Sequence, residues 1–172
     1  LMLGGDGDAL VATSIQQPAT FALEYGLART WLALGAKPVA LVGHSVGEFV
    51  AAVIAGVMDV ATAMRLVARR GVLMQALPPG AMLSVRLAAD ALALRLPATL
   101  SLAADNGPAA CVVSGPVDDI EAFRLQLDAE GIAARTLQTS HAFHSAMMDP
   151  AVAPFADALR DVELRAPTLP II

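Results

Sequence analysis

The spacing of apolar and polar residues divides the chain near residue 80 into two parts with different predicted secondary structure. The first part combines helical periodicity with one short, continuous apolar run, a pattern typical of an α/β arrangement. It predicts a buried strand over 37–44 and helices over 16–35, 47–57 and 59–77. Pro18 suits the first turn of the first helix, and Asp59 is placed to cap the start of the third.

After residue 80, shorter apolar segments predict strands that alternate with helices. The longest of these helices has one apolar face, formed by Ile120, Phe123 and Leu127. The predicted strands are 81–87, 99–105, 110–115, 132–138 and 166–172, and the predicted helices are 88–96, 117–131 and 150–161. The first four strands and the helices between them follow the order βαββαβ, which is typical of a ferredoxin-like unit.

A serine stands at the junction between the first predicted strand and the helix that follows it. The sequence Gly-His-Ser-Val-Gly has the Gly-x-Ser-x-Gly form of a nucleophile elbow, in which a strained turn exposes the serine hydroxyl. We expect Gly43 and Gly47 to leave room for the strand and helix to approach, and the backbone N–H of Val46 to face an oxyanion. Ser45 is therefore the candidate nucleophile, and a simple helix cap is the alternative.

Together these patterns predict an α/β protein made of two subdomains. The larger subdomain, over 1–79 and 141–172, is expected to be α/β-hydrolase-like, with a parallel sheet and the nucleophile elbow. The smaller subdomain, over 80–140, is expected to be an inserted ferredoxin-like βαββαβ unit.

A nucleophilic serine needs a base, and the chain contains three histidines. His44 adjoins Ser45 in the turn and is poorly placed to reach its hydroxyl, so we expect a structural role for it. His141 and His144 stand together in Ser-His-Ala-Phe-His-Ser, and periodicity does not choose between them as the base. Asp149 is not a convincing third member of a triad, so a Ser–His dyad is the more economical hypothesis.

One arginine falls within the apolar face of the helix over 59–77. On a helical wheel, Arg70 lies in the middle of this face, while Arg65 and Arg69 point the other way. The face consists of Ala63, Leu66, Val67, Leu73 and Met74. A buried guanidinium requires an anion, which is either a structural carboxylate or a carboxylate of the substrate. Its planar fork suits the second role because it binds a carboxylate through two parallel hydrogen bonds.

The composition narrows the possible functions further. The chain has 172 residues, of which 56% are hydrophobic and 16% charged, as in a folded domain with a substantial core. A net charge of −5 with a single lysine argues against a nucleic-acid surface, and no apolar run reaches the roughly 20 residues that cross a membrane. The one cysteine, Cys111, lies in an apolar segment, so we expect no disulfide, no metal site and a reducing cytoplasm.

Four motifs carry a resemblance to a known family. They are, in order, GHSVGEFVAA, ARRGVLMQALPPGAML, ADNGPAACVVSG and SHAFHSAMMDP. In this order they resemble the acyltransferase domain of modular polyketide synthases and the related malonyl-CoA:acyl carrier protein transacylases. The resemblance implies ping-pong transfer of an acyl group from acyl-CoA, through a serine ester, to the phosphopantetheine thiol of an acyl carrier protein. It also implies no bound cofactor, and neighbouring ketosynthase and other synthase domains as partners.

The resemblance assigns roles to several residues. Ser45 matches the family nucleophile, and His144 matches the family base. Arg70 matches the arginine that holds the free carboxylate of the extender unit, and the backbone N–H of Val46 matches an oxyanion donor.

The specificity signal is the sequence HAFH, supported by GHSVGE. In the family this wording accompanies malonyl units, whereas methylmalonyl-selecting domains tend to read YASH and GHSQGE. A bulky Phe143 beside the catalytic histidine would crowd an α-methyl group, a difference worth about 1–3 kcal/mol. The other residues expected near the pocket are His44, His141, Gln17 and Asn106.

Two segments of the family pattern are not found in this sequence. One is an N-terminal GQGSQ-like segment that supplies a second oxyanion donor, and the other is the stretch after the Pro-Ile-Ile strand. The chain is therefore expected to be the middle of a domain, cut at both ends. Because losing one oxyanion donor costs about 10²–10³ in rate, a catalytically inactive core or docking module is an alternative function. A serine hydrolase or thioesterase, with water as the acceptor, is a further alternative.

Overall fold

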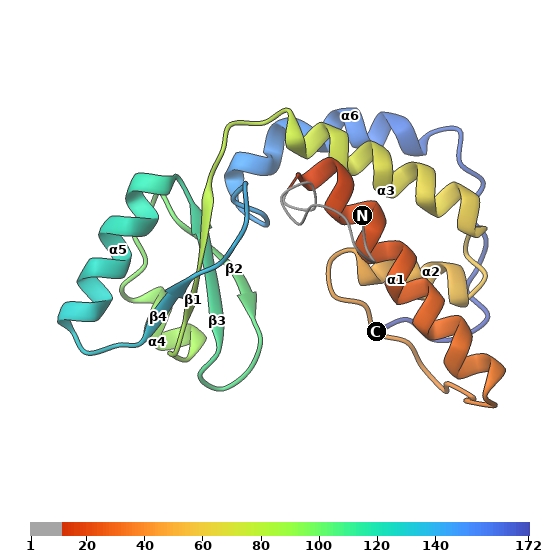
Figure 1. The fold of residues 1–172 in the computed structure, drawn as a ribbon, viewed down its shortest axis with the longest axis horizontal. Helices are drawn as coiled ribbons and strands as arrows, with labels where there is room; N and C mark the ends of the chain where they lie inside the picture. Colours follow the sequence, from red (N-terminus) through yellow and green to blue (C-terminus); the bar gives the residue numbers. More distant parts are fainter. Residues whose placement is uncertain (1–11) are drawn as a thin grey trace, which may run out of the picture. The chain divides into compact units, whose positions relative to one another are not determined.

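The computed structural model describes residues 12–172, which fall into two compact units (Figure 1). The first unit ends at Leu73 and resumes over Pro154–Ile172, and the second unit is the continuous segment Met74–Ala153. The sequence also predicted a discontinuous part and a continuous part. Its subdomain limits at residues 80 and 140 differ from these unit limits and stay a prediction.

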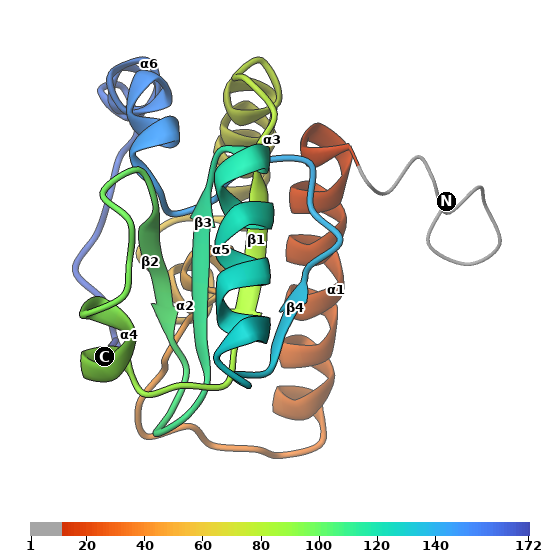
Figure 2. The ribbon, with the colours of Figure 1, turned by 90° about the vertical axis from the view of Figure 1, so that its left-hand side faces the viewer.

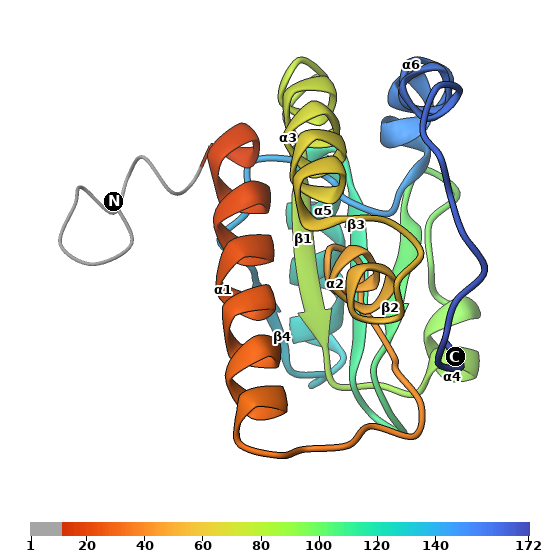
Figure 3. The same ribbon diagram turned by 90° about the vertical axis from the view of Figure 1, so that its right-hand side faces the viewer.

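Three helices make up most of the first unit (Figure 3). They are α1 (Thr13–Ala33), α2 (Gly47–Ile54) and α3 (Val60–Gln75), and each corresponds to a predicted helix with shifted ends. Their apolar sides share one core, which is formed by Phe21, Val46, Val50, Ala63 and Val67. Arg65 and Arg69 are exposed, as the helical wheel predicts.

The start of the first helix differs from the prediction. Because α1 begins at Thr13, Pro18 lies inside the helix rather than in its first turn. Proline has no backbone N–H, so the carbonyl of Ser14, four residues earlier, has no helical donor at this position. The prediction placed the helix start by the proline signal, which does not exclude a further turn of helix before it.

The strand expected over 37–44 is reduced to a single parallel bridge between Leu41 and Ile171. The N–H of Leu41 donates to the carbonyl of Pro170, and the N–H of Ile172 donates to the carbonyl of Leu41, each at 2.9 Å. A strand needs partners along its length, and among the described residues this segment pairs only with the short stretch around Ile171. The predicted parallel pairing is therefore present only at this bridge.

The sequence also predicted that the segment 37–44 is buried, and this prediction is wrong. None of its residues is buried in the part of the chain that the structure describes. Val39 is 87% exposed and Val42 is 78% exposed, although both belong to the continuous apolar run. An apolar run indicates that a segment can be buried, but the partner that buries it must come from elsewhere in the fold.

The second unit contains a four-stranded sheet with helices on one face (Figure 2). Its elements are β1 (Ala81–Val85), α4 (Ala89–Ala93), β2 (Ser101–Asp105), β3 (Cys111–Gly115), α5 (Val117–Ala129) and β4 (Ala134–Thr136). This is the βαββαβ order that the sequence predicts. The strands lie in the order β2-β3-β1-β4, and all neighbouring strands are antiparallel.

The core of the second unit lies between the sheet and its helices. The predicted apolar face of α5, formed by Ile120, Phe123 and Leu127, is buried there. Cys111 is a free, fully buried thiol on β3, as expected for a strand residue. Burial raises the pKa of this thiol, which keeps it protonated and unreactive.

The last helix, α6 (Asp149–Leu159), follows a short 3₁₀ turn over Ala146–Met148 and begins before the end of the second unit. In the first unit, Phe155 of α6 contacts Phe49 of α2 edge to face, with ring centroids 6.3 Å apart. None of the helices in the described part of the chain is both long enough and apolar enough to cross a bilayer.

The start of α3 is capped by Asp59, as predicted. One carboxylate oxygen accepts the backbone N–H of Thr62 at 2.8 Å, and the other accepts its hydroxyl at 3.0 Å. These hydrogen bonds, the backbone one foremost, lower the pKa of the Asp59 carboxyl. A folded-state pKa below the unfolded value means that the ionised cap stabilises the fold above the unfolded pKa, and that this stabilisation is lost as the pH falls through the folded pKa.

We expect Asp59→Ala to lower the melting temperature by a few degrees at pH 7, because Thr62 loses its cap. The difference from the unchanged protein is expected to narrow on acidification, which thermal unfolding monitored by circular dichroism at several pH values measures. Asp59→Asn, which can still accept the backbone hydrogen bond, is the control. An Asn variant as unstable as the Ala variant would show that capping is not the cause.

Candidate active site

The backbone at Ser45 is strained in the way that an elbow requires. Ser45 has a φ of +54°, and it shares a positive φ with only one other described non-glycine residue, His144 at +59°. A left-handed conformation costs a residue with a side chain about 1–2 kcal/mol, so the surrounding turn must hold it in place. The turn is closed by hydrogen bonds from Gly47 N–H to the His44 carbonyl at 3.0 Å and from Glu48 N–H to the Ser45 carbonyl at 3.2 Å.

The two glycines of the elbow have different environments. A Cβ on Gly43 would lie 2.3 Å from the backbone nitrogen of Glu48 and 2.4 Å from its Cα, so no side chain fits there. A Cβ on Gly47 would meet only the side chain of Glu24, at 3.4 Å. The prediction that both glycines permit close approach is therefore confirmed for Gly43 and wrong for Gly47.

Val46 connects the turn to the core. Its side chain is 8% exposed and packs with Phe21 and Val50, which fixes the residue between Ser45 and α2. The residue is the N-cap of α2, where backbone N–H groups have no partner within the helix. An N–H at this position lies at the positive end of the helix dipole, which favours a developing negative charge.

Arg70 is half-buried on α3, with the buried residues Leu66, Val67 and Met74 on the same side of the helix. Its guanidinium donates a hydrogen bond to the side-chain oxygen of Gln17 on α1. Burial lowers the pKa of Arg70, and the negative charge of Glu48 partly opposes this, but an arginine stays protonated at neutral pH. Among the described residues no carboxylate lies within ion-pair distance of it; the neutral amide of Gln17 accepts a hydrogen bond, and the negative charge of Glu48 acts from farther away.

A close helix crossing brings Arg70 and Gln17 together. A Cβ on Gly71 would lie 3.0 Å from the carbonyl oxygen of Thr13 and 3.1 Å from the Cα of Ser14. Gly71 therefore lets α3 pack directly against the first turn of α1, one turn before Gln17. Sequence reasoning missed this role, although a glycine inside a helical pattern is a recognised sign of close packing.

In the second unit, His141 has a structural environment. It is 3% exposed, and its two ring nitrogens lie 2.8 Å from the Ser140 hydroxyl and 3.1 Å from the Leu77 carbonyl. In the neutral ring, Nε2–H donates to the carbonyl and Nδ1 accepts from the hydroxyl. The bond to Leu77 ties the segment that carries both histidines to the residues just before β1, and the bond to Ser140 fixes the ring within its own segment.

Gly80 provides a second contact between the histidine segment and the residues just before β1. Its N–H donates to the Ser140 carbonyl at 3.2 Å, and a Cβ there would lie 2.6 Å from the Cβ of Ala142. The Pro-Pro-Gly segment at 78–80 therefore contacts the histidine segment at its one residue without a side chain. This contact was also missed, because nothing in the local sequence indicates which distant segment a turn glycine will meet.

His144 and Phe143 lie at the end of the same segment. His144 is exposed, and Phe143 is half-buried with its ring stacked on that of His141 at a centroid distance of 6.2 Å. Ser145 fixes the next turn, since its hydroxyl donates to the Ala142 carbonyl at 2.7 Å and accepts the Met147 N–H at 3.2 Å. His144 is therefore an exposed imidazole on a backbone that is held at both sides.

Asn106 lies apart from these residues within the second unit. It follows β2, where its backbone N–H donates to the Ala110 carbonyl at 2.8 Å. It lines an open hollow with Asp90 and Asp105, in which no other predicted site residue lies. A place for Asn106 in a substrate pocket stays a prediction.

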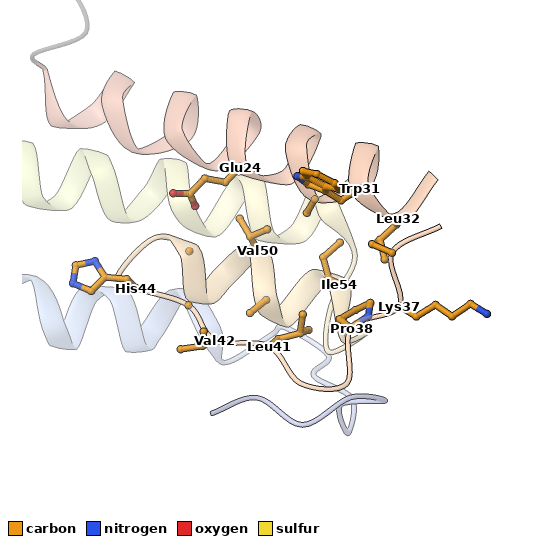
Figure 4. A pocket seen from close by; sticks show the side chains of 15 residues that line it. Glu24, Trp31, Leu32, Lys37, Pro38, Leu41, Val42, His44, Val50 and Ile54 are labelled. Atoms are coloured by element: carbon orange, nitrogen blue, oxygen red, sulfur yellow. The ribbon is translucent and has the colours of Figure 1, made fainter. Parts of the chain in front are cut away.

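A cavity of about 600 Å³ lies in the first unit, between α1, the segment 36–44 and α2 (Figure 4). Its walls are mainly apolar, and its polar lining residues are Glu24, Lys37 and His44. In Figure 4, the Lys37 side chain extends away from the other labelled side chains. The residues that line it include His44, Gly43 and Gly47 of the elbow, but neither Ser45 nor Arg70.

Within the first unit the structure thus brings Arg70 to Gln17 and places Ser45 beside Val46 at the start of α2. Within the second unit it brings His141 and Phe143 together, next to His144. The pairing of Ser45 with a histidine joins residues of both units and stays a prediction.

Comparison with known proteins decides the family. A family model described as the acyl transferase domain matches residues 1–172, the whole chain. The chain belongs to this family. The family of acyltransferase domains includes those of polyketide synthases, and its members are transferases.

Relatives of this acyltransferase include large synthases from Mycobacterium tuberculosis. It is 42% identical to one component of the phenolphthiocerol/phthiocerol polyketide synthase over 156 residues, which are 91% of this chain and 10% of the relative. It is also 42% identical to mycoketide-CoA synthase over 173 residues, which are 100% of this chain and 4% of the relative. The chain thus spans a tenth or less of the length of these relatives.

Solved structures show the same fold. The acyltransferase domain from the second module of the salinomycin polyketide synthase is 40% identical, with a TM-score of 0.92 over 98% of this acyltransferase chain and 41% of that chain. FabD from Acinetobacter baumannii is 32% identical, with a TM-score of 0.89 over 96% of this chain and 57% of that chain. The predicted α/β class is therefore confirmed.

Proposed function

We propose that this acyltransferase moves a malonyl unit from malonyl-CoA to the phosphopantetheine thiol of an acyl carrier protein, within polyketide biosynthesis. The observation that carries the proposal is the left-handed backbone of Ser45, held just before the Val46 N-cap of α2 by a turn that only a glycine at position 43 permits. Such strain persists only where the surrounding structure imposes it, and it clusters at functional sites.

In the proposed first half-reaction, His144 takes the hydroxyl proton of Ser45 as its oxygen attacks the thioester carbonyl carbon of malonyl-CoA. The Val46 N–H at the start of α2 stabilises the resulting oxyanion. The carbon–sulfur bond breaks, His144 returns the proton to the CoA thiolate, and malonyl-Ser45 remains. In the second half-reaction, His144 deprotonates the carrier thiol, which attacks the ester carbonyl, and Ser45 leaves with the proton.

Arg70 supports the choice of a substrate with a free carboxylate. It is a half-buried cation whose only described hydrogen-bond partner is the neutral Gln17, so an anion is needed to complete its pairing. We propose that Gln17 holds one edge of the guanidinium and leaves the rest of the fork for the malonyl carboxylate.

Phe143 supports malonyl over methylmalonyl. Its ring is packed on His141, which is itself fixed by two hydrogen bonds, so the ring beside His144 has little freedom to move away from an α-methyl group. Discrimination by one methyl group is limited to about 10–200-fold, and we therefore expect some methylmalonyl loading.

The proposal is tested by intact-protein mass spectrometry after brief exposure to malonyl-CoA and methylmalonyl-CoA in competition. We expect a malonyl adduct that is in excess over methylmalonyl and absent from Ser45→Ala. Predominant methylmalonyl loading would contradict the substrate assignment, and an adduct that persists in Ser45→Ala would contradict the nucleophile.

A catalytically inactive core or docking module is the second candidate, in which Ser45 is not acylated at all. The same experiment, run beside a version extended at both ends, distinguishes the two. Labelling of the extended version alone would assign this chain as an inactive core. Rapid loss of the adduct to water, without a thiol acceptor, would instead favour a serine hydrolase.

The remaining assignments belong to the same proposal. We propose that residues 80–140 are a ferredoxin-like subdomain, supported by the strand order β2-β3-β1-β4, and that the rest of the chain belongs to an α/β-hydrolase-like subdomain. His44, His141 and Asn106 are proposed to shape the pocket or its supports. Flanking ketosynthase and carrier domains, and a cytoplasmic location, complete the assignment.

A further inference from the structure

The backbone of His144 is strained in the same sense as that of Ser45. The φ of +59° at His144 and of +54° at Ser45 are the only positive values among the non-glycine residues that the structure describes. The two residues belong to different units, so the turn at Ser45 does not explain the strain at His144. A left-handed residue with a side chain persists only where its surroundings impose the conformation. Some feature of the second unit must therefore hold His144 in place.

The sequence at this position does not favour the conformation by itself. His144 is the third residue of a turn over Ala142–Ser145, and a positive φ at that position is normally supplied by glycine or asparagine. Burial does not supply the constraint either, because His144 is exposed. The constraint has to come from the residues on either side of it.

The residue that begins the turn, Ala142, is fixed to the body of the second unit. It is fully buried, and its Cβ lies 2.6 Å from the point where a Cβ on Gly80 would stand. The N–H of Gly80 also donates to the carbonyl of Ser140, two residues earlier. The carbonyl of Ala142 is therefore a fixed point to which the rest of the turn can be attached.

The residue that ends the turn, Ser145, makes this attachment through its side chain. Its hydroxyl donates to the Ala142 carbonyl at 2.7 Å, and this hydrogen bond spans Phe143 and His144. The same oxygen accepts the N–H of Met147 at 3.2 Å, which caps the 3₁₀ turn before α6. One hydroxyl thus joins the two sides of the His144 backbone, through a donated bond to the turn and an accepted bond to the following helix.

We infer that Ser145 is the positioning residue that holds His144 in its left-handed conformation, and that the donated hydrogen bond is the one that matters. Without this bond, His144 can rotate to an ordinary negative φ, which changes the direction of its Cα–Cβ bond and carries the imidazole away from the proton it must accept. The inference rests on the proposed function, since it concerns the base of that reaction and names what aims it.

Three substitutions separate the two hydrogen bonds of the hydroxyl. Ser145→Ala removes both of them. Ser145→Asp keeps an acceptor for the Met147 N–H, but an ionised carboxylate cannot donate to the Ala142 carbonyl. Ser145→Thr keeps both, and its β-branched side chain suits the extended backbone at this position, where φ is −124° and ψ is 170°.

The measurement is the rate of Ser45 acylation by saturating malonyl-CoA, followed by intact-protein mass spectrometry beside denaturant unfolding. We expect Ser145→Ala to lower both the rate, by about 10-fold, and the stability. Ser145→Asp is expected to recover the stability but not the rate, and Ser145→Thr to recover both. Rates are compared where they no longer rise with pH, so that a carboxylate beside His144 does not change the fraction of neutral imidazole.

Several outcomes would overturn the inference. A normal rate in Ser145→Ala or Ser145→Asp would show that the donated bond does not aim the base. An effect confined to the KM for malonyl-CoA would place Ser145 in substrate binding instead. The control is Asp59→Ala, which removes a helix cap in the first unit and is expected to change the rate by less than about threefold. An equal fall in rate in this control would show that loss of a cap alone slows acylation.

The backbone of His144 can also be observed without turnover. In isotope-labelled protein, a left-handed residue gives a strong nuclear Overhauser effect between its own amide and α protons, because they lie closer together than in a right-handed residue. We expect this strong effect at His144 in the unchanged chain and in Ser145→Thr, and a weak one in Ser145→Ala and Ser145→Asp. If the unchanged chain forms no acyl-enzyme, the proposed function fails, yet this signal still decides the role of Ser145. A strong effect in Ser145→Ala would overturn that role whether or not the chain is active.

Discussion

We expect Gly43→Ala to reduce the rate of Ser45 acylation by about 100-fold or more and to destabilise the fold. The new methyl group would lie 2.3 Å from the backbone nitrogen of Glu48, and backbone atoms cannot rotate away as a side chain can. The first turn of α2 must shift instead, which carries Ser45 and the Val46 N–H out of position. A displacement of about 1 Å at reacting groups costs about 10²-fold in rate, and overpacking of this kind costs about 1–3 kcal/mol.

The matched control is Gly47→Ala, four residues later in the same motif. Its methyl group would meet only the Glu24 side chain at 3.4 Å, an ordinary contact, so we expect near-normal acylation and stability. Acylation is measured by the malonyl adduct on the intact protein, and stability by denaturant unfolding. Equal damage from the two substitutions would show that the steric difference between the glycines is not what shapes the elbow.

The second large effect is expected at Arg70. We expect Arg70→Leu to lower the ratio of malonyl to acetyl loading on Ser45 by about 100-fold or more, equivalent to about 2.7 kcal/mol. The loss arises because the malonyl carboxylate would be left beside an apolar side chain, whereas the acetyl group has no charge to satisfy. Competition between malonyl-CoA and acetyl-CoA, read by mass spectrometry, measures the ratio directly.

Two further substitutions define the cause. Arg69→Leu removes the neighbouring arginine, which is exposed on the other side of α3, and is expected to leave the ratio unchanged. Arg70→Lys keeps the charge but not the planar fork, so an intermediate ratio is expected. If Arg70→Leu reduces malonyl and acetyl loading equally, its role is to hold α3 against α1 through Gln17, and carboxylate recognition must lie elsewhere.

Local patterns predicted most of the helices and strands because the forces that fix them are local. The apolar face of α5 and the cap at Asp59 depend only on residues a few positions apart, and both are as predicted. The segment around Leu41 failed because a strand depends on distant partners. Its sequence indicates that it can be buried, but one bridge to Ile171 is its only pairing among the described residues.

In the candidate site, too, features fixed by nearby residues were predictable and features fixed by distant residues were not. The strained turn at Ser45 and the position of Arg70 on the helix were predictable, because each follows from spacing within one element. The partner of Arg70 was not, since Gln17 reaches it only through the close approach of α1 and α3 at Gly71. Likewise, His141 is held by a hydrogen bond to the main-chain carbonyl of Leu77. Every residue has a backbone carbonyl, so the sequence could not indicate this partner.

The positive φ at Ser45 also limits the routes by which this site could change its chemistry in evolution. Cysteine has a single atom at the γ position, as serine does, so it fits the same left-handed backbone without added strain. Threonine carries a second γ atom, and β-branched residues rarely adopt this conformation. The elbow can thus exchange an oxygen nucleophile for a sulfur one by a single substitution, whereas a threonine nucleophile would require a different turn.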